Sequence, residues 1–586
     1  MSRFTVSENR FLLDGKDFRI ISGAFHYFRC LQSGWDDILW KMKAFGCNTV
    51  ETYIPWSLHE EEKGVFTFAD NLDLEAFIQK VDNADMKLIL RPGPYICAEF
   101  DGGALPGWLL SDKFLRIRCS HPGFINHVRE YFNKILPIIS KYQIDNNGPV
   151  IMVQLENEYG GYGNDASYLH SLMEMYKYHK ITVPVFTSDQ PIPWMLENGS
   201  IPGVLKTANF GSRAKERFQK LAQIQPNRPL FCAEFWVGWF DSWGNAHHER
   251  AAQDTAEAFD QLLETGGSVN IYMFFGGTNF GYTPGANHKL GEPFEADVTS
   301  YDYSALLAED GSITEKYLRM RSVLEKHIDL PELPSFANTK YLSETSAEVT
   351  AGADLFANLD RISQKVSSPY TMDMEEISCY KGFCLYRTRV TGPRTGEIAI
   401  PGVQDWAAVY LDAKQQGEIF INDPKPSMKL SIPAGEHTLD ILLENLGHVN
   451  FGFRTMDRKG ITQGVTLDGA MLHNWEIYPL PFEYTHIQRI EYLPSFSGQG
   501  PCFVQAVFNA DNPGSAYLDC SSLGKGNAFI NGFHLGRFWN KGPQLDLYIP
   551  GSLIQQRRNT IDLFCCKHLE NLPKTLLLKP ARTYRR

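Results

Sequence analysis

Between residue 20 and about residue 326, short apolar runs alternate with segments of helical periodicity. Eight runs have the length and composition of buried strands: residues 19–25, 48–54, 87–91, 150–156, 183–188, 204–209, 230–235 and 269–275. One intervening segment has apolar residues at i, i+3, i+4 and i+7: Trp35, Ile38, Leu39 and Met42. Ser33 is its candidate cap, and Gly46 lies just beyond its end. Eight such units predict an α/β fold, a (β/α)8 TIM barrel, with a doubly wound sheet as the alternative.

The pattern of predicted secondary structure changes after Ile328. Leu330-Pro331-Glu332-Leu333-Pro334 has the composition of a linker, and short strands separated by turn residues follow it. We expect two all-β sandwich domains of jelly-roll type, with limits at 1–332 (barrel), 333–480 (first sandwich) and 481–586 (second sandwich). Residues 340–370 could pair with either sandwich. The segments from Val409 and from Phe529 resemble each other, which suggests a weak internal repeat.

Charge and cysteine content narrow the function classes. The net charge is −12 and no long basic run occurs, which argues against nucleic acid and anionic membranes as partners. No apolar run approaches the roughly 18 residues of a membrane span, and the N-terminus shows no signal-peptide pattern. The 11 cysteines are scattered without metal-ligand spacing. We therefore expect a cytoplasmic protein with reduced thiols, no metal, no cofactor and no disulfide framework.

Two predicted strands end in carboxylates. The run 149–153 leads into Gln154-Leu155-Glu156-Asn157-Glu158-Tyr159-Gly160, and the run from Leu230 reaches Glu234 among aromatic residues. Buried polar groups are costly unless they meet a polar partner, and at the carboxyl end of a barrel strand that partner is usually a substrate. Glycoside hydrolysis needs two carboxyl groups, one to donate a proton and one to attack or to activate water. The fourth and seventh strands would present Glu158 and Glu234 on one barrel face, about 5 Å apart if the enzyme retains configuration.

A less specific interpretation competes with this one. A lone glutamate at a strand end is more often a surface or salt-bridged residue, and Glu156 could turn away from the site by strand alternation. Aromatic residues near Glu234 nevertheless offer flat faces for a sugar ring: Phe235, Trp236, Trp239 and Trp243. The tyrosines in Thr299-Ser300-Tyr301-Asp302-Tyr303 could donate a hydrogen bond to a carboxylate. These residues alone do not name the sugar.

At these positions the sequence resembles the β-galactosidases of glycoside hydrolase family 35. The segment 154–160 resembles the acid/base signature of that family, and Arg91-Pro92-Gly93-Pro94-Tyr95-Ile96-Cys97-Ala98-Glu99 resembles its third-strand segment. Further matching segments are 51–56, 105–109, 234–239, 270–281, 299–303 and 536–544. The resemblance therefore runs through almost the whole chain.

The resemblance implies a retaining exo-β-galactosidase that needs no cofactor. Glu158 would be the acid/base, Glu234 the nucleophile, and Asn157 would hydrogen-bond the galactose 2-hydroxyl. The residues expected to hold the other hydroxyls are Tyr53, Cys97, Ala98 and Glu99, with Glu99 as the specificity carboxylate. Tyr272 and Tyr303 would flank the nucleophile, and Trp239 would form an apolar wall. For Cys97 and Ala98 the alternative is packing with backbone contacts only, and Trp108 is expected in the core.

Departures from the family pattern concern the leaving group. Phe451 and the pair Phe235-Trp236 stand where many members have tyrosine, and residues 101–104 differ beside Glu99. The sequence resembles the bacterial, signal-less type of the family, which implies a preference for β-1,3-linked galactose, for instance on N-acetylglucosamine. Trp236, Trp239 and Trp243 are the candidate acceptor platform.

The expected partner is a galactose-terminated oligosaccharide, and a homodimer is left open. One alternative function is the same chemistry on another exo-β-glycoside, such as a β-glucosaminide. The other is a glycan-binding protein without turnover. We expect the sandwiches to buttress the barrel, with sugar binding by them as the less favoured alternative.

Overall fold

The computed structural model describes residues 2–496, 500–566 and 573–585 of the chain. Its N-terminal part is a closed barrel of parallel strands in the order β10-β11-β4-β5-β6-β7-β8-β9. The strands are β4 (Ile21–Phe25), β5 (Thr49–Tyr53), β6 (Lys87–Arg91), β7 (Val150–Gln154), β8 (Val185–Asp189), β9 (Leu205–Phe210), β10 (Phe231–Trp236) and β11 (Ser268–Phe275). Each overlaps one predicted strand. The TIM barrel prediction is confirmed, and the doubly wound sheet is wrong.

Helices surround the barrel, and the first of them lies where the periodicity of Trp35, Ile38, Leu39 and Met42 predicts it. They are α1 (Trp35–Phe45), α2 (Trp56–His59), α3 (Leu74–Asn83), α4 (Pro122–Lys141), α5 (Ala166–Tyr178), α6 (Pro193–Asn198), α7 (Ala214–Ile224), α8 (Ala252–Glu264) and α9 (Glu315–Leu324). Gly46 ends α1 with a φ of 114°, as expected. Ser33 is not the cap of α1, because a 3-10 turn intervenes and Gly34 takes that position. The Ser33 hydroxyl instead lies 3.1 Å from that of Ser552 in the C-terminal β domain.

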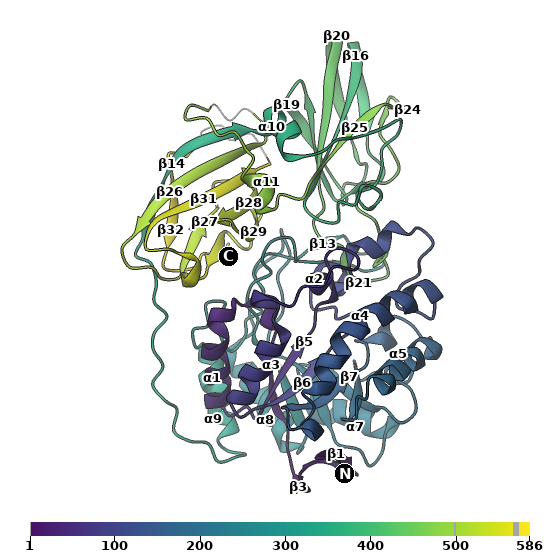
Figure 1. Cartoon of the computed structure of the whole chain (residues 1–586), viewed down its shortest axis with the longest axis vertical. Helices are drawn as coiled ribbons and strands as arrows, with labels where there is room; N and C mark the ends of the chain where they lie inside the picture. The colour runs from purple at the N-terminus through teal and green to yellow at the C-terminus, as the bar shows by residue number, and fades with distance from the viewer. Residues whose placement is uncertain (1, 497–499, 567–572, 586) are drawn as a thin grey trace.

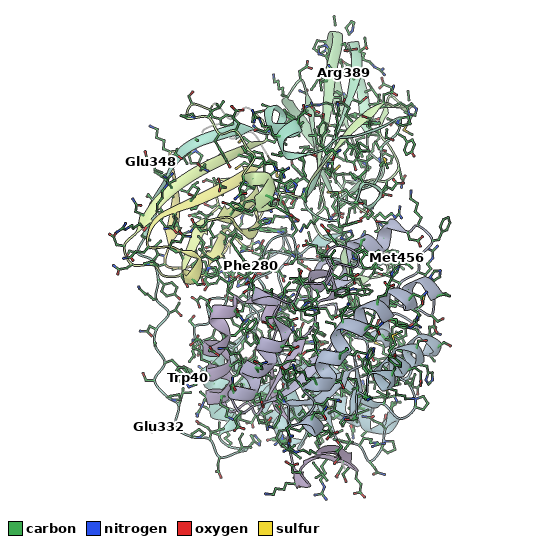
Figure 2. The ribbon with its side chains drawn as sticks, in the orientation of Figure 1. Trp40, Phe280, Glu332, Glu348, Arg389 and Met456 are labelled. Carbon is green, nitrogen blue, oxygen red and sulfur yellow. The ribbon has the colours of Figure 1, made fainter. Side chains whose placement is uncertain are left out.

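Two segments outside the barrel strands pack against the barrel, one at its amino end and one along its side. The antiparallel strands β1 (Phe4–Ser7), β2 (Arg10–Leu13) and β3 (Lys16–Asp17) cover the amino end, where the ring of Phe11 meets that of Phe231 edge-on. After α9 the predicted linker runs along the outside of the barrel toward the β domains (Figure 1). Glu332 lies on this segment (Figure 2), and the ring of Phe336 packs 4.7 Å from that of Trp40 on α1.

The β domains sit over the carboxyl end of the barrel (Figure 1). The first is built on a sheet with the order β15-β25-β16-β20-β18-β19. Its strands are β15 (Val366–Ser368), β16 (Phe383–Ala399), β18 (Trp406–Leu411), β19 (Lys414–Phe420), β20 (Ser427–Glu444) and β25 (Trp475–Leu480), with β23 (Thr466–Leu467) and β24 (Ala470–Met471) at its edge. Smaller pieces complete this region: α10 (Leu355–Ile362), β17 (Val403–Gln404) and β22 (Gly460–Ile461).

Strands β16 and β20 are each longer than the sequence indicates. Each looks like two short strands, because Gly392-Pro393 and Pro433-Ala434-Gly435 have turn composition. In the structure these residues form an irregularity within one continuous antiparallel pair, with a register shift between Gly392 and Arg394 and a φ of 113° at Gly435. The pair forms the projection labelled β16 and β20 in Figure 1.

The C-terminal β domain is a sheet with the order β29-β28-β31-β26-β14-β32-β27-β30. Its strands are β14 (Thr345–Asp354), β26 (Cys502–Ala510), β27 (Ala516–Asp519), β28 (Lys525–Ile530), β29 (Phe533–Trp539), β30 (Asp546–Ile549), β31 (Arg557–Cys565) and β32 (Thr575–Lys579), and the short helix α11 (Tyr484–Ile487) precedes it. Strands β29 and β30, at the two ends of this order, contact each other. Residues 340–370, left open by the sequence, divide between the two β domains: β14 pairs with β26 and β32 of this sheet, whereas β15 pairs with β25 of the first. The predicted domain limits stay predictions.

The internal repeat is only partial in three dimensions. In the first copy, residues 430–432 and 438–442 lie on the single strand β20. Their counterparts, residues 547–549 and 560–564, lie on the separate strands β30 and β31. Cys97, Cys232 and Cys384 are buried, as expected, and each is a free thiol.

The barrel and the β domains share buried contacts at their junction, where Phe280 and Met456 lie (Figure 2). Strands β12 (Ala286–His288) and β13 (Glu295–Ala296) extend from the barrel, and β12 pairs in parallel with β21 (Val449–Gly452) of the first β domain. The ring of Phe280 packs 5.0 Å from that of Phe533 in the C-terminal domain. The domains therefore form one continuous body around the carboxyl end of the barrel.

The C-terminal tail also returns to the barrel. Arg582 Nη1 lies 2.7 Å from Glu309 Oε2 and 3.6 Å from Asp302 Oδ2. Two residues further on, the ring of Tyr584 stacks 3.7 Å from that of His247. The C-terminal tail therefore contacts the barrel at and near the segment 299–304.

A buried imidazole joins the barrel to the first β domain. His448 Nδ1 lies 3.0 Å from Asp101 Oδ1 of the barrel, and its Nε2 lies 2.9 Å from Glu375 Oε1. Burial opposes the charged imidazolium, but the two carboxylates outweigh it and raise the pKa of His448 to about 10. His448 is therefore a cation between two anions at neutral pH.

We expect His448→Gln to lower the free energy of unfolding by about 3 kcal/mol near pH 6, because it leaves the buried Glu375 and the partly buried Asp101 without their cation. A raised folded-state pKa contributes its full stability below the unfolded pKa of about 6.5 and loses it as the pH rises through about 10. Denaturant unfolding of both proteins at pH 6 and pH 10.5 measures this. An equal difference at the two pH values would contradict a charged His448.

Candidate active site

The carboxyl ends of the barrel strands bring the two predicted catalytic glutamates to one cavity. Glu158 follows β7 with a left-handed backbone, at a φ of 45°. Glu234 lies within β10, where the pairing with β9 and β11 is irregular between Cys232 and Phe235. Such an irregularity re-aims a side chain, and it is common beside active sites. Both carboxyl groups line a cavity of about 380 Å³.

The cavity collects nearly all residues that the sequence predicts for the site. Those that line it are Tyr53, Cys97, Ala98, Glu99, Asn157, Glu158, Glu234, Trp236, Trp239, Tyr272 and Tyr303. Trp243 is the exception and corrects the expected acceptor platform. Its side chain is 8% exposed and packs beside Trp539, because the junction between barrel and C-terminal β domain uses its ring as core.

Glu234 is surrounded by hydrogen-bond donors. Its Oε1 accepts from Arg91 Nη2 at 2.6 Å and from the Tyr53 hydroxyl at 2.9 Å, and its Oε2 accepts from Trp236 Nε1 at 3.1 Å. An ionised carboxylate has only acceptor sites, so it can use all three donors. This environment suits a group that must act as an anion.

Glu158 has a different environment. Burial and the nearby charge of Glu234 raise the pKa of Glu158 to about 7, against a hydrogen bond of 3.0 Å from Asn209 Nδ2, which lowers it. Glu158 can therefore carry a proton near neutral pH. Two carboxyl groups in one cavity with opposed environments are the arrangement that separates an acid from a nucleophile.

Arg91 connects Glu234 to Asn157. Its Nη2 donates to Asn157 Oδ1 and to Glu234 Oε1, each at 2.6 Å, and Asn157 Nδ2 donates to the Ile96 carbonyl at 3.2 Å. Glu51 lies 3.5 Å from Arg91 Nη1, and burial raises the pKa of Glu51 to about 7. The sequence analysis did not assign Arg91 a role, although it ends a predicted strand.

On one wall of the cavity, three consecutive non-glycine residues have a left-handed backbone. The φ angles of Cys97, Ala98 and Glu99 are 57°, 54° and 48°. Such backbone is unfavourable for these residues and persists where surrounding contacts enforce it, often at a binding site. Here Arg29 donates to the Ala98 carbonyl, and the Tyr301 hydroxyl donates to Glu99 Oε2. Burial raises the pKa of Glu99 to about 7.

Neighbouring residues behave as the sequence predicts in three further cases. Glu156 turns away from the cavity, and both of its oxygens accept from Arg118 at 2.8 Å. Trp108 is core and packs edge-on against Trp56. The Tyr301 hydroxyl does reach a carboxylate, that of Glu99, rather than Glu234.

The departures from the family pattern have different locations. Phe235 is fully buried against Phe259 and does not reach the cavity. Phe451, on β21 of the first β domain, does line it and pairs with Asn287 of β12. The β domain thus supplies part of the wall.

Sequence reasoning missed several residues that line the cavity. They are Gln190, Phe240, Asp241, Ser242, Asn245, Ala246, His248, Asn287, Lys289 and Glu295. Most lie on loops after strands and have no periodic signal. Asn209 is different: it ends a predicted strand, so the rule that drew attention to Glu158 would also have found it.

The described ranges 2–496, 500–566 and 573–585 contain neither a candidate metal site nor a candidate membrane helix. No group of three or more His, Cys, Asp or Glu side chains there could hold a metal ion. No helix in the same ranges is long and apolar enough to cross a membrane.

Comparison with known proteins agrees with this geometry. The family model "Glycosyl hydrolases family 35" matches residues 10–327, and two further models match the β domains: "Beta-galactosidase, first all-beta domain" at 369–481 and "Beta-galactosidase, galactose-binding domain" at 501–559. A β-galactosidase of Xanthomonas manihotis is 37% identical, over 93% of this chain and 91% of that protein. β-Galactosidase 1 of Dictyostelium discoideum is 35% identical, over 98% and 92%.

Among solved structures, a β-galactosidase from the psychrophilic Marinomonas ef1 matches with a TM-score of 0.38 and 11% identity, over 52% of this chain and 59% of that one. The family assignment rests on the sequence matches, which cover the barrel and both β domains. The chain is a glycoside hydrolase, and it belongs to glycosyl hydrolase family 35.

Proposed function

We propose that the protein is a retaining exo-β-galactosidase that removes terminal non-reducing β-D-galactose from oligosaccharides. Glu234 attacks C1 of galactose while Glu158 gives its proton to the glycosidic oxygen, so the C1–O bond breaks and a glycosyl ester forms on Glu234. The Glu158 carboxylate then takes a proton from water, whose oxygen attacks C1 and displaces Glu234. Two displacements at C1 leave its configuration unchanged.

The single observation that carries this proposal is the contrast between the two carboxyl groups. Glu234 accepts hydrogen bonds from three donors, whereas burial and a neighbouring negative charge favour the protonated form of Glu158. After the first step Glu234 is an uncharged ester. That loss of charge lowers the pKa of Glu158, which prepares it to act as a base in the second step.

The other cavity residues suit a galactose ring. Asn157 and Glu99 provide acceptors and donors at the closed end, and Tyr53, Tyr272 and Tyr303 surround the nucleophile. The leaving sugar would lie against Trp236 and Trp239, whose rings meet edge-on at 5.5 Å, with Trp239 39% exposed. A preference for β-1,3 linkages is part of the proposal.

Two alternatives have distinct outcomes. If the enzyme acts on β-glucosaminides, an aryl β-N-acetylglucosaminide turns over faster than the aryl β-galactoside. If it only binds glycans, neither turns over and galactose still binds. The cytoplasmic location and the homodimer stay predictions.

Replacing each glutamate separates their roles. Glu234→Gln should lower kcat on an aryl β-galactoside by about 10⁴-fold or more, because no covalent intermediate can form. This loss corresponds to an activation barrier that is higher by about 5 kcal/mol or more. Glu158→Gln should lose far more activity on a disaccharide than on a dinitrophenyl galactoside, because only the disaccharide needs a proton on its leaving oxygen.

Steady-state kinetics of the three proteins provide the test, and proton NMR of the first product reports its anomeric configuration. Equal losses of activity on both substrates for Glu158→Gln would show that Glu158 is not the general acid. An inverted first product would exclude the retaining mechanism.

The alkaline limit of activity should report Glu158. Activity on a disaccharide requires protonated Glu158, so kcat/KM should fall as the pH rises through about 7. Asn209→Leu removes a donor that favours the carboxylate, which should raise the pKa of Glu158 and move this limit to higher pH.

Ser188→Ala is the matched control for that experiment. The Ser188 hydroxyl donates to Asn209 Oδ1 at 2.5 Å. Its removal leaves the hydrogen bond from Asn209 to Glu158 in place. Its pH profile should stay close to that of the wild type. An alkaline limit in Asn209→Leu that is unchanged, or that moves to lower pH, would show that Glu158 does not control it.

A further inference from the structure

A second cavity adjoins the active site on the side of the acid/base residue. Its volume is about 490 Å³, and it shares Glu158, Gln190, Lys289 and Phe451 with the active-site cavity. Here we call it the side groove. The sequence analysis placed the leaving group at Trp236 and Trp239, and it also linked Phe451, which lines both cavities, to the leaving group. The side groove meets the active-site cavity at Glu158.

The barrel and the first β domain both line the side groove. Tyr162 and, from α6, Met195 come from the barrel; Leu290 and Phe453 lie on another wall, where β12 of the barrel pairs with β21 of the first β domain. Leu290 is 83% exposed and Phe453 57% exposed. Large apolar side chains this exposed, held by a strand pair beside a reactive centre, indicate a surface that a ligand covers.

The polar groups at the base of the side groove already have partners inside the protein. Arg118 is paired with Glu156, the Tyr95 hydroxyl donates to the Asn450 carbonyl, and Asp189 Oδ1 accepts from the Gly160 amide. Burial raises the pKa of Asp189 well above its usual range, which disfavours the charged form of this carboxyl. A ligand here meets no uncompensated charge at the base, which favours a neutral molecule with apolar faces.

We propose that the side groove binds the second sugar of the leaving group, counted from the bond that is cleaved. This inference rests on the proposed function. The leaving oxygen must lie beside Glu158, and Glu158 is also at the mouth of the side groove. A chain that continues beyond the first leaving sugar passes the shared residues Gln190, Lys289 and Phe451 and reaches the aromatic face of Phe453. The preferred substrate is therefore a galactoside with at least two sugars in its leaving group.

The test compares a galactosyl disaccharide with the trisaccharide that carries one further neutral sugar at its reducing end. The wild type should cleave the trisaccharide with a kcat/KM about 5- to 10-fold higher, mainly through a lower KM, the effect of one aromatic contact with a sugar face. Phe453→Ala should remove this advantage and leave the rate on an aryl β-galactoside unchanged. Leu290→Ala, on the same wall, should reduce the advantage in part.

Phe114→Ala is the matched control, because Phe114 is 84% exposed and lines neither cavity. It should keep the full preference for the trisaccharide. Equal kcat/KM for the two oligosaccharides in the wild type would overturn the side-groove proposal alone, as would a Phe453→Ala variant that keeps the preference. A wild type that does not turn over the aryl galactoside would instead overturn the proposed function, and the side-groove proposal with it.

Discussion

The buried guanidinium of Arg91 is the constraint on which the active site depends. Its side chain is 1% exposed and lies among Glu51, Asn157 and Glu234. A buried cation without a partner costs several kcal/mol, so the carboxylates must stay close to it. Because Arg91 ends β6, Asn157 follows β7 and Glu234 lies on β10, one charge sets the relative positions of three strands. The position of Glu234 therefore depends on the electrostatics of the barrel as well as on its own strand.

The barrel alone does not complete the site. The loop that carries Cys97, Ala98 and Glu99 is held from outside by the segment around β12 and β21: the Gly285 amide donates to the Glu99 carbonyl at 3.1 Å, and the Tyr95 hydroxyl donates to the Asn450 carbonyl. These contacts explain how a left-handed run of three residues is maintained. They also explain why the first β domain contributes Phe451 to the cavity. The β domains therefore act on the shape of the binding site as well as on stability.

The eight barrel strands and the two glutamates could be predicted because their signals are local. Apolar runs end abruptly in polar residues, and the parallel topology gathers the strand ends. Three features needed tertiary information. The sequence places Arg91 at the end of a predicted strand but does not show which strands its guanidinium connects, and Trp243 looks like a sugar-binding residue until its packing against Trp539 is known. Turn residues inside β16 and β20 indicated chain reversals, whereas cross-strand pairing keeps both strands continuous.

The contacts of the C-terminal tail constrain the order in which parts of the protein can fold during synthesis. Arg582 contacts Asp302 and Glu309, and Asp302 stands between Tyr301, which binds Glu99, and Tyr303, which lines the cavity. These contacts join Arg582 to a segment that is synthesised almost three hundred residues earlier. A ribosome exposes the barrel long before it exposes Arg582. The finished geometry behind these two tyrosines is therefore reached only after translation of the C-terminal tail, and a chain cut short of it leaves Asp302 and Glu309 without their cation.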